Sequence, residues 1–352
     1  MKSLRDKIVS IVRSGLAGVF HVSSGYRKHL RGKVAILMYH RVLTSEEVAS
    51  QAVQPGMYVL DTIFAQQMDF LKRSFTVLSF RELLALWRDG MWDEHARYCV
   101  ITFDDGWLDN YRHAYPVLKR LGLPATIFLP TDYVGSDQWF WPDQIAYLLR
   151  TAHVDALGVK QVERIKGLLF ELLGVSGESL MEVVLHEEGA ADQLIDRCKT
   201  LRKDQIQTLV NTLAVDLGVS LPVGRVVVNW DEVREMSQGG ISFGSHSCSH
   251  RIMTTITSSE VSQELVQSGQ ILERAGINYI PVFCYPNGNS NAEIQAQAKA
   301  HGYEAAVSVQ AGVEAAQPGN RFALRRVGIH NDVTHSIPLF SLRLCGLLSR
   351  TN

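Results

Sequence analysis

Long hydrophobic runs are missing from this chain of 352 residues. Residues 8–12 and 16–20 are mostly apolar, but Arg13 separates them. A membrane-spanning helix needs about 20 consecutive apolar residues, and a secretory signal needs an unbroken apolar core followed by a cleavage site with small residues. Neither pattern is clear in the sequence, so we expect no spanning segment and no secretory leader.

Cysteine is scarce and scattered along the sequence. An odd number at irregular spacing excludes the disulfide framework of a small secreted domain. Scattered free thiols are typical of a reducing compartment, so the sequence predicts a cytoplasmic protein. The five cysteines are Cys99, Cys198, Cys248, Cys284 and Cys345.

An excess of charge of one sign is also lacking, because the formal net charge is −1. Since the sequence has neither a strong net positive charge nor a glycine-rich phosphate loop, we expect no nucleic-acid partner. The composition, with 46% hydrophobic and 20% charged residues, is typical of globular proteins and excludes disorder of the whole chain. The length exceeds that of a typical single domain but fits one barrel with an insertion.

Short apolar segments alternate with helical patterns along most of the chain, which predicts an α/β fold with parallel strands. Residues 63–71, 80–88 and 258–275 carry apolar side chains at helical spacing. The predicted strands are residues 34–39, 76–79, 98–103, 125–129, 241–244, 281–285 and 305–309.

The most informative motif is Asp104-Asp105-Gly106, which directly follows the apolar strand 98–103. Adjacent side chains on a strand point to opposite sides, so one acid is able to bind a metal while the other transfers protons. A second motif, His246-Ser-Cys-Ser-His250, follows the predicted strand 241–244. Two imidazoles and one carboxylate leave one coordination position open for water, as in catalytic zinc sites.

Each motif alone has an ordinary structural explanation. Asp-Asp-Gly is a common turn sequence, and two histidines four residues apart are more often a surface or core pair than metal ligands. Here both motifs follow predicted strands of the same chain, and a barrel of parallel strands collects the carboxyl ends of its strands on one face. Their joint occurrence therefore favours a metal site.

With these residues the chain resembles the polysaccharide deacetylases that have a NodB homology domain (carbohydrate esterase family 4). Residues 102–106 match the first family motif, Thr-Phe-Asp-Asp-Gly, and residues 246–250 match the shorter form of the second motif. The third motif departs from the pattern, since residues 284–288 read Cys-Tyr-Pro-Asn-Gly, with Asn287 where a family variant has Tyr. The resemblance covers roughly residues 34–135 and 225–330.

The resemblance implies an α/β fold of a particular kind, a distorted (β/α)7 barrel of parallel strands with the active site at their carboxyl ends. Residues of about 137–225 break the alternation and predict a helical insertion, within which Asp143 is a further site candidate. We expect the deacetylase barrel over residues 34–335. A basic amphipathic segment, residues 1–33, precedes it, and an amphipathic tail, residues 336–352, follows it.

The resemblance also implies a metal centre. Its ligands would be Asp105, His246 and His250, which hold a divalent ion that polarises an acetyl carbonyl and lowers the pKa of water. Zinc is the first expectation for two histidines and one aspartate. Affinity order alone does not fix the metal, so cobalt, nickel and manganese remain alternatives.

The remaining roles concern proton transfer and the oxyanion. The resemblance assigns the general base to Asp104. It assigns the substrate and oxyanion contacts to Asn287, through its backbone N–H, and to Tyr285. His40, in the segment Met-Tyr-His, is similar to the general acid of extracellular poly-N-acetylglucosamine deacetylases, where it would protonate the departing amine. Its alternative is a histidine that only hydrogen-bonds the backbone, and His330 competes for the acid role.

Arg326 is the candidate for orienting Asp104, a task that an arginine of the third motif performs in other members. Arg326-Val-Gly-Ile329 is similar to the closing Arg-Ile-x-Val segment of the same subgroup. The alternative is an ordinary surface arginine, and the sequence leaves the two interpretations open.

Both ends of the chain carry amphipathic patterns, with Lys and Arg opposite the apolar side. They fit either basic helices on a membrane surface or ordinary helices packed on the barrel, and the second interpretation is slightly favoured. The N-terminal apolar positions are Leu4, Ile8, Ile11, Val12, Val19 and Phe20. The C-terminal segment has Ile337, Leu339, Phe340, Leu342, Leu344, Leu347 and Leu348, with Arg343 and Arg350.

Together these features predict a metal-dependent hydrolase that removes N-acetyl groups from an N-acetylated glycan or a lipid-linked amino sugar during the synthesis of surface polysaccharide. The expected location is cytoplasmic, with peripheral contact to the inner face of the membrane. One alternative is a metal-dependent amidohydrolase for a small non-sugar amide. The other is a glycan-binding barrel without turnover, which has no need of the complete set of acids and histidines.

Overall fold

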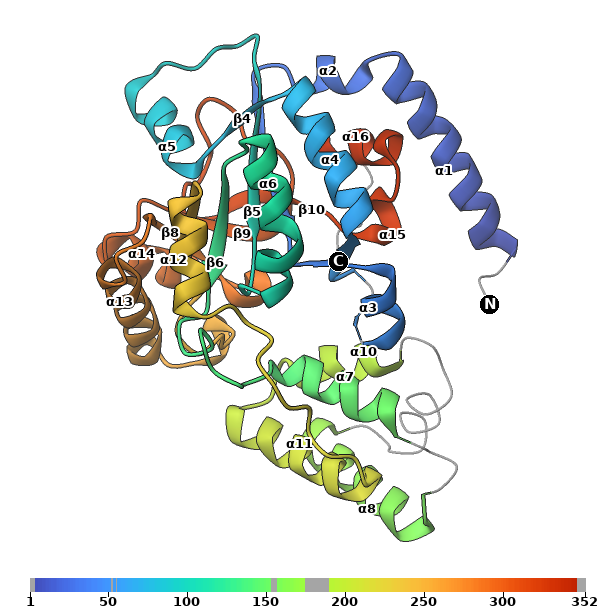
Figure 1. The fold of residues 1–352 in the computed structure, drawn as a ribbon. Helices are drawn as coiled ribbons and strands as arrows, with labels where there is room; N and C mark the ends of the chain where they lie inside the picture. The colour runs from blue at the N-terminus through green and yellow to red at the C-terminus, as the bar shows by residue number, and fades with distance from the viewer. Residues whose placement is uncertain (1–3, 52, 55, 153–156, 175–189, 347–352) are drawn as a thin grey trace. The chain divides into compact units, whose positions relative to one another are not determined.

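The computed structural model describes residues 4–51, 53–54, 56–152, 157–174 and 190–346 (Figure 1). Leu347, Leu348 and Arg350 of the predicted tail lie outside the described residues. Two compact units make up the chain. Unit 1 contains residues 1–44, 55–136 and 227–352, and unit 2 contains residues 45–54 and 137–226. No helix in the described ranges combines the length and the apolar character needed to cross a membrane.

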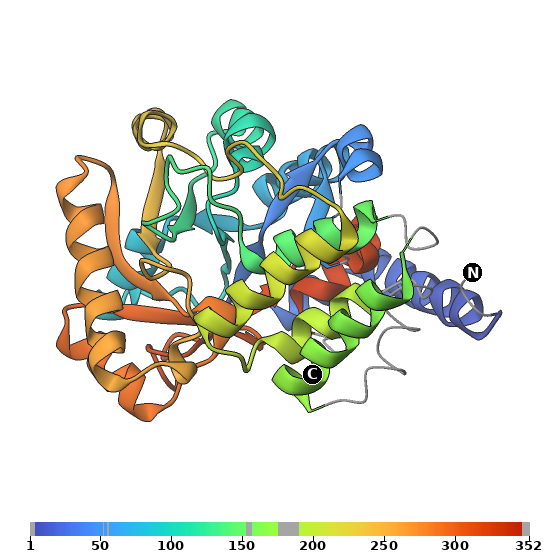
Figure 2. The ribbon, with the colours of Figure 1, turned by 90° about the horizontal axis from the view of Figure 1, so that it is seen from below.

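Unit 1 is a closed barrel of seven parallel strands, which confirms the predicted fold class. Neighbouring strands follow the order β1-β10-β9-β8-β7-β6-β5, and β5 pairs with β1 to close the ring. Figures 1 and 2 show the strands of this unit inside a layer of helices. The strands are β1 (Lys33–Tyr39), β5 (Arg97–Phe103), β6 (Ala125–Leu129), β7 (Ile241–Ser245), β8 (Tyr279–Cys284), β9 (Ala305–Ala311) and β10 (Leu324–Gly328).

The seventh barrel strand differs from the sequence prediction. The predicted strand 76–79 exists as β4 (Thr76–Leu78), but it pairs only with the first half of β5, whereas β6 pairs with the last two residues of β5. The ring is closed instead by β10, which the strand prediction missed because Arg325 and Arg326 interrupt its apolar pattern. A separate small sheet pairs β2 (Arg41–Leu43) with β3 (Tyr58–Leu60).

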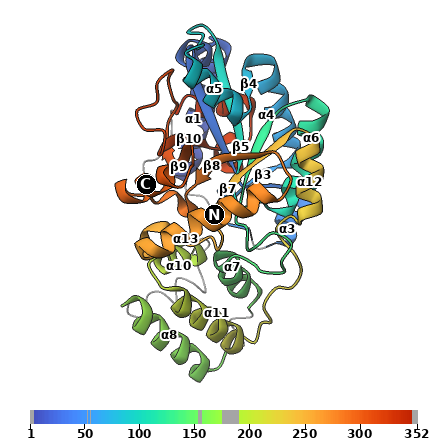
Figure 3. The same cartoon turned by 90° about the vertical axis from the view of Figure 1, so that its left-hand side faces the viewer.

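Helices connect the strands of unit 1, and several have clear start signals. α5 and α13 each begin with a capping box, in which Ser79 with Glu82 and Thr257 with Glu260 exchange side-chain and backbone hydrogen bonds. Figure 3 shows α12 and α13 on the outside of the barrel beside β7 and β8. The helices are α1 (Leu4–Val22), α2 (Gly25–His29), α4 (Asp61–Ser74), α5 (Phe80–Asp89), α6 (Tyr115–Leu121), α12 (Trp230–Gln238), α13 (Ser258–Arg274), α14 (Ala292–Ala300), α15 (Asn331–Thr334) and α16 (Ile337–Leu344). Short helical turns cover Asn110–Ala114, Met253–Thr255 and Pro286–Gly288.

Unit 2 is helical where it is described. Its helices bury an aliphatic core of their own, to which Ile145, Ile165, Leu194 and Leu209 contribute fully buried side chains. The helices are α3 (Ser45–Ser50), α7 (Trp141–Thr151), α8 (Val159–Leu173), α10 (Ala190–Cys198) and α11 (Lys203–Leu217). Asp143 lies in α7.

The barrel leaves no room for extra volume at Gly244 on β7. A Cβ atom built there meets the Phe128 ring at 2.6 Å and the backbone oxygen of Val282 at 2.8 Å. The neighbouring strands β6 and β8 supply these atoms, so the contact is not relieved by a side-chain rotation alone. Close packing at this position therefore requires glycine.

Gly244→Ala should lower the free energy of unfolding by about 1–3 kcal/mol, because overpacking in a closed barrel forces the strands apart. Urea unfolding followed by circular dichroism measures the change. Gly18→Ala on α1 is the matched control, since nothing lies within 4 Å of a Cβ there and alanine favours a helix. Equal stability of the Gly244→Ala variant and the wild type would contradict the packing argument.

Candidate active site

The candidate site lies at the carboxyl ends of the barrel strands, where parallel-strand barrels carry their functional residues. His40 directly follows β1, and Asp104 and Asp105 follow β5. His246 follows β7 in the same way, and Arg326 lies within β10. The ring topology therefore brings together residues that are more than 200 positions apart in the sequence.

Asp105 lies against both histidines of the second motif. Its Oδ1 atom is 3.3 Å from Nε2 of His246 and 3.1 Å from Nε2 of His250. The three side chains offer ligand atoms that all lie within 4.8 Å of one another. Asp105 and His246 are buried, and His250 is partly exposed. The sequence-predicted ligands thus converge on one point at the end of the barrel.

The outer hydrogen bonds of this group fit a metal ion. Nδ1 of His246 lies 2.7 Å from the backbone oxygen of Cys284, so it donates its proton there, and Nε2 faces Asp105. The indole Nε1 of Trp107 donates to Oδ2 of Asp105 at 2.9 Å, which leaves Oδ1 to face the histidines. Two histidine nitrogens and one carboxylate oxygen are the donor set of catalytic zinc sites.

A second combination of possible ligands, Asp104, His246 and Cys284, is less suited to a cation. Burial raises the pKa of the Cys284 thiol, so the sulfur remains protonated at neutral pH. The metal-binding form of cysteine is the thiolate. Asp105, His246 and His250 are therefore the group whose chemistry fits a metal ion better.

A buried glutamate holds the loop that carries the two histidines. Glu264 on α13 accepts hydrogen bonds from the backbone N–H groups of Cys248 (2.7 Å) and Ser249 (3.0 Å). The loop needs this support because Ser247 and His250 adopt positive φ angles of 65° and 56°, which cost side-chain-bearing residues energy. Sequence reasoning missed Glu264, since a glutamate within an amphipathic helix normally faces solvent.

Arg326 forms a bidentate ion pair with Asp104. Nη1 and Nη2 of the guanidinium each donate to one carboxylate oxygen at 2.7 Å. The arginine is 1% exposed, and its Nε donates to the backbone oxygen of Ser308 at 2.9 Å. Arg326 is therefore not an ordinary surface arginine, since it is buried and paired with Asp104.

Electrostatics keeps both aspartates ionised. Burial raises the pKa of Asp104, but the charge and hydrogen bonds of Arg326 outweigh it and lower the pKa below its usual value. Burial also raises the pKa of Asp105, but hydrogen bonds with His246 and His250 hold that pKa well below the usual range. Two ionised carboxylates therefore lie side by side at neutral pH.

His40 lies next to the carboxylate of Asp104. Its Nε2 atom is 3.9 Å from Oδ2 of Asp104, and the side chain is 19% exposed, so it is open to a substrate. The backbone oxygen of His40 accepts a hydrogen bond from Asn110 at 2.8 Å, which fixes the strand end. The competing His330 instead faces Asp332, with 3.6 Å between Nδ1 and Oδ2.

Tyr285 and Asn287 of the third motif lie in different environments. Tyr285 is 1% exposed, and its hydroxyl donates to the backbone oxygen of Phe322 at 3.0 Å, so this side chain belongs to the core. Asn287 is exposed and adopts a positive φ of 55° in the turn after β8. Its predicted role at the oxyanion rests on the backbone N–H and remains a prediction.

Trp107 is a further candidate residue of the site, which the sequence analysis missed. The indole is 1% exposed, and the guanidinium of Arg41 lies 4.4 Å from its ring centre. Arg41 is in turn paired with Asp109 at 2.8 Å. This chain of contacts holds the indole N–H on Asp105. A Trp two residues after the second aspartate is the only sequence signal for it.

Asp104→Asn should retain bound metal, whereas His246→Ala should lose it, because only His246 contributes a ligand atom to the assigned position. Metal content after dialysis, measured by mass spectrometry, distinguishes the variants. Thermal unfolding checks that each variant is folded, since Asp104→Asn removes the charge that faces Arg326. Equal metal loss in two folded variants would reverse the assignment of the two aspartates.

Trp107→Phe should weaken metal binding by about 10–100-fold, because the ring stays in the core while Asp105 loses its hydrogen-bond donor. Competition with a chelating dye measures the affinity. Trp87→Phe is the matched control, since that indole is also buried but donates to the backbone of Ala315. Unchanged affinity in Trp107→Phe would show that the indole N–H does not position the ligand.

Comparisons with known proteins were consistent with this site. The sequence profile of the family described as Polysaccharide deacetylase matches residues 93–157 and 199–306. YxkH of Bacillus subtilis (strain 168), described as a candidate polysaccharide deacetylase, is 22% identical over 300 residues, which are 84% of this chain and 71% of that protein. The poly-beta-1,6-N-acetyl-D-glucosamine N-deacetylase of Staphylococcus epidermidis is 24% identical over 232 residues, or 62% of this chain and 73% of that protein.

Solved structures share the fold. The deacetylase PplD of Streptococcus pyogenes has a TM-score of 0.53 at 19% identity, with 86% of this chain and 94% of that chain covered. IcaB of Ammonifex degensii has a TM-score of 0.54 at 16% identity, with 88% and 97% covered. The family depends in general on a divalent metal, in agreement with the ligand set found here. The chain belongs to the polysaccharide deacetylase family and is a hydrolase of that type.

Proposed function

We propose that this deacetylase removes N-acetyl groups from an N-acetylated polysaccharide or a lipid-linked amino sugar during the synthesis of surface polysaccharide. The observation that carries the proposal is the position of the ionised Asp104 beside the ligand set of Asp105, His246 and His250. The relative from Staphylococcus epidermidis, named for N-deacetylation of poly-N-acetylglucosamine, supports the substrate class.

We propose zinc as the ion, because two histidines and one aspartate with an open position are typical of catalytic zinc. Cobalt, nickel and manganese suit the same ligands and remain alternatives. When bound by Asp105, His246 and His250, the ion supplies polarisation of the acetyl carbonyl and activation of water. The hydrogen bonds from Trp107 and to Cys284 keep the ligand atoms turned toward that position.

Asp104 is the general base of the proposed reaction. Both of its oxygens are held by Arg326, yet each keeps a further lone pair with which to accept a proton from the attacking water. The bidentate geometry prevents rotation of the carboxylate, so the base is oriented before the substrate arrives. The backbone N–H of Asn287 is the proposed donor to the oxyanion that forms on the acetyl carbonyl.

His40 completes the proton transfers as the general acid. Its Nε2 faces Asp104, and its partial exposure allows contact with a glycan. When the carbon–nitrogen bond breaks, His40 donates a proton to the departing amine while the water oxygen stays with the acetyl group. The products are acetate and a free amino sugar, and the proton taken up by Asp104 balances the one given by His40.

The proposed location is the cytoplasm, where a membrane-linked sugar intermediate would be accessible. The support is that all five cysteines are free and buried in the structure. The alternatives of a small-amide hydrolase and a non-catalytic glycan-binding barrel are distinguished by turnover, because only the proposed function predicts acetate release from sugars.

The purified protein should release acetate from N-acetylglucosamine oligomers, lose this activity with a chelator and regain it with zinc or cobalt. His40→Ala should lower turnover by about 10²–10⁴-fold, because it removes general acid catalysis, while metal content stays constant. His330→Ala is the matched control and should retain activity. Metal-loaded protein without acetate release from any acetylated sugar would overturn the proposed substrate class.

A further inference from the structure

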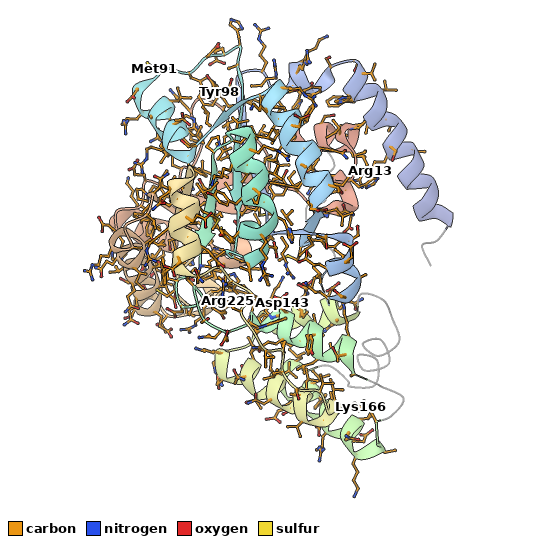
Figure 4. The ribbon with its side chains drawn as sticks, viewed as in Figure 1. Arg13, Met91, Tyr98, Asp143, Lys166 and Arg225 are labelled. Carbon is orange, nitrogen blue, oxygen red and sulfur yellow. The ribbon has the colours of Figure 1, made fainter. Side chains whose placement is uncertain are left out.

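Where its side chains are described, from Val12 to Val22, helix α1 packs one face against the C-terminal helices. Ala17 is fully buried against Leu339 and Leu342 of α16, and Phe20 packs against the same cluster. His21 hydrogen-bonds Ser341 at 3.0 Å between Nδ1 and Oγ. Arg13, which Figure 4 shows between α1 and the C-terminal helices, donates to the backbone oxygen of Val333 at 3.2 Å. The inner face of α1 thus carries one small, one aromatic and two polar side chains.

The outer face of α1 is apolar and exposed. Val12, Leu16, Val19 and Val22 are 55%, 65%, 70% and 84% exposed, and their spacing of four, three and three residues places them in one stripe. The sequence prediction had grouped Phe20 with Val12 and Val19, but Phe20 turns inward. Helices on the surface of globular proteins normally bury their apolar stripe, so α1 has the reverse arrangement.

The charges around this stripe indicate what covers it. Residues 1–33 contain eight Lys or Arg and one Asp, a formal charge of +7 in a chain whose total is −1. Arg27, Lys28 and Arg31, which follow α1, are exposed. A second copy of the chain would bring two segments of +7 together, which is unfavourable. An anionic surface is complementary to both the charge and the apolar stripe.

We infer that α1 is a docking helix for an anionic lipid bilayer, with Val12, Leu16, Val19 and Val22 entering the boundary between headgroups and acyl chains. An exposed apolar helical stripe next to a segment with exposed basic side chains fits a helix that lies in the membrane interface. Contact with α16 keeps the helix folded before it meets the lipid. This surface is separate from the candidate active site and does not depend on the proposed reaction.

Sedimentation of the full chain with vesicles tests the inference. The protein should bind phosphatidylcholine vesicles that contain about 30% phosphatidylglycerol more strongly than vesicles of phosphatidylcholine alone. High salt should weaken this binding. Val19→Glu should lower the partition coefficient by about tenfold. Lys28→Ala should lower it by about fivefold, the share expected for one basic residue near an anionic surface.

Met91→Glu is the matched control, because Met91 is also apolar and 69% exposed but lies on the opposite side of unit 1 from α1 (Figure 4). It should bind vesicles like the wild type. Unchanged thermal unfolding and acetate release from soluble oligomers would show that Val19→Glu affects docking alone. Absence of lipid-dependent sedimentation, an equal loss in Met91→Glu, or a concentration-dependent dimer that Val19→Glu disrupts would each overturn the inference.

Discussion

The site depends on one buried ion pair, between Asp104 at the end of β5 and Arg326 on β10. Removing two charges from water is costly, and such a pair is favourable only when hydrogen bonds satisfy its remaining donors. Here the backbone oxygen of Ser308, Oγ1 of Thr102 and Sγ of Cys284 accept the other three guanidinium protons. Loss of either partner would leave an isolated buried charge, a penalty of about 3–5 kcal/mol. The same contact therefore orients Asp104, the proposed base, and ties β10 to β5.

Asp105, His246 and His250 are held in place by a second set of contacts, which involves both backbone and side-chain atoms. Asp105, Ser247 and His250 all have positive φ angles, and each such residue costs about 1–3 kcal/mol. Glu264 offsets this cost in the histidine loop, and the indole of Trp107 does so at Asp105. The ligand atoms thus face one point because surrounding residues keep the strained turns in place.

Apolar runs followed by acids or histidines made most of the barrel predictable from the sequence, and with it the convergence of Asp105, His246 and His250. β10 was missed because its arginines hide a strand in which Arg326 points inward to a buried partner. Trp107 and Glu264 were missed for a related reason: each acts through a residue that is close only after folding. β4 was overestimated, since its pattern is that of a strand but does not reveal how far it pairs.

The distance in sequence between Asp104 and Arg326 has a consequence for biosynthesis. The two residues are 222 positions apart, and ribosomes add about 5–20 residues per second. The aspartate is therefore made roughly 10–45 s before the arginine that neutralises it. During that interval the nascent barrel lacks its closing strand and Asp104 lacks its partner, so the two residues pair only after translation has passed Arg326.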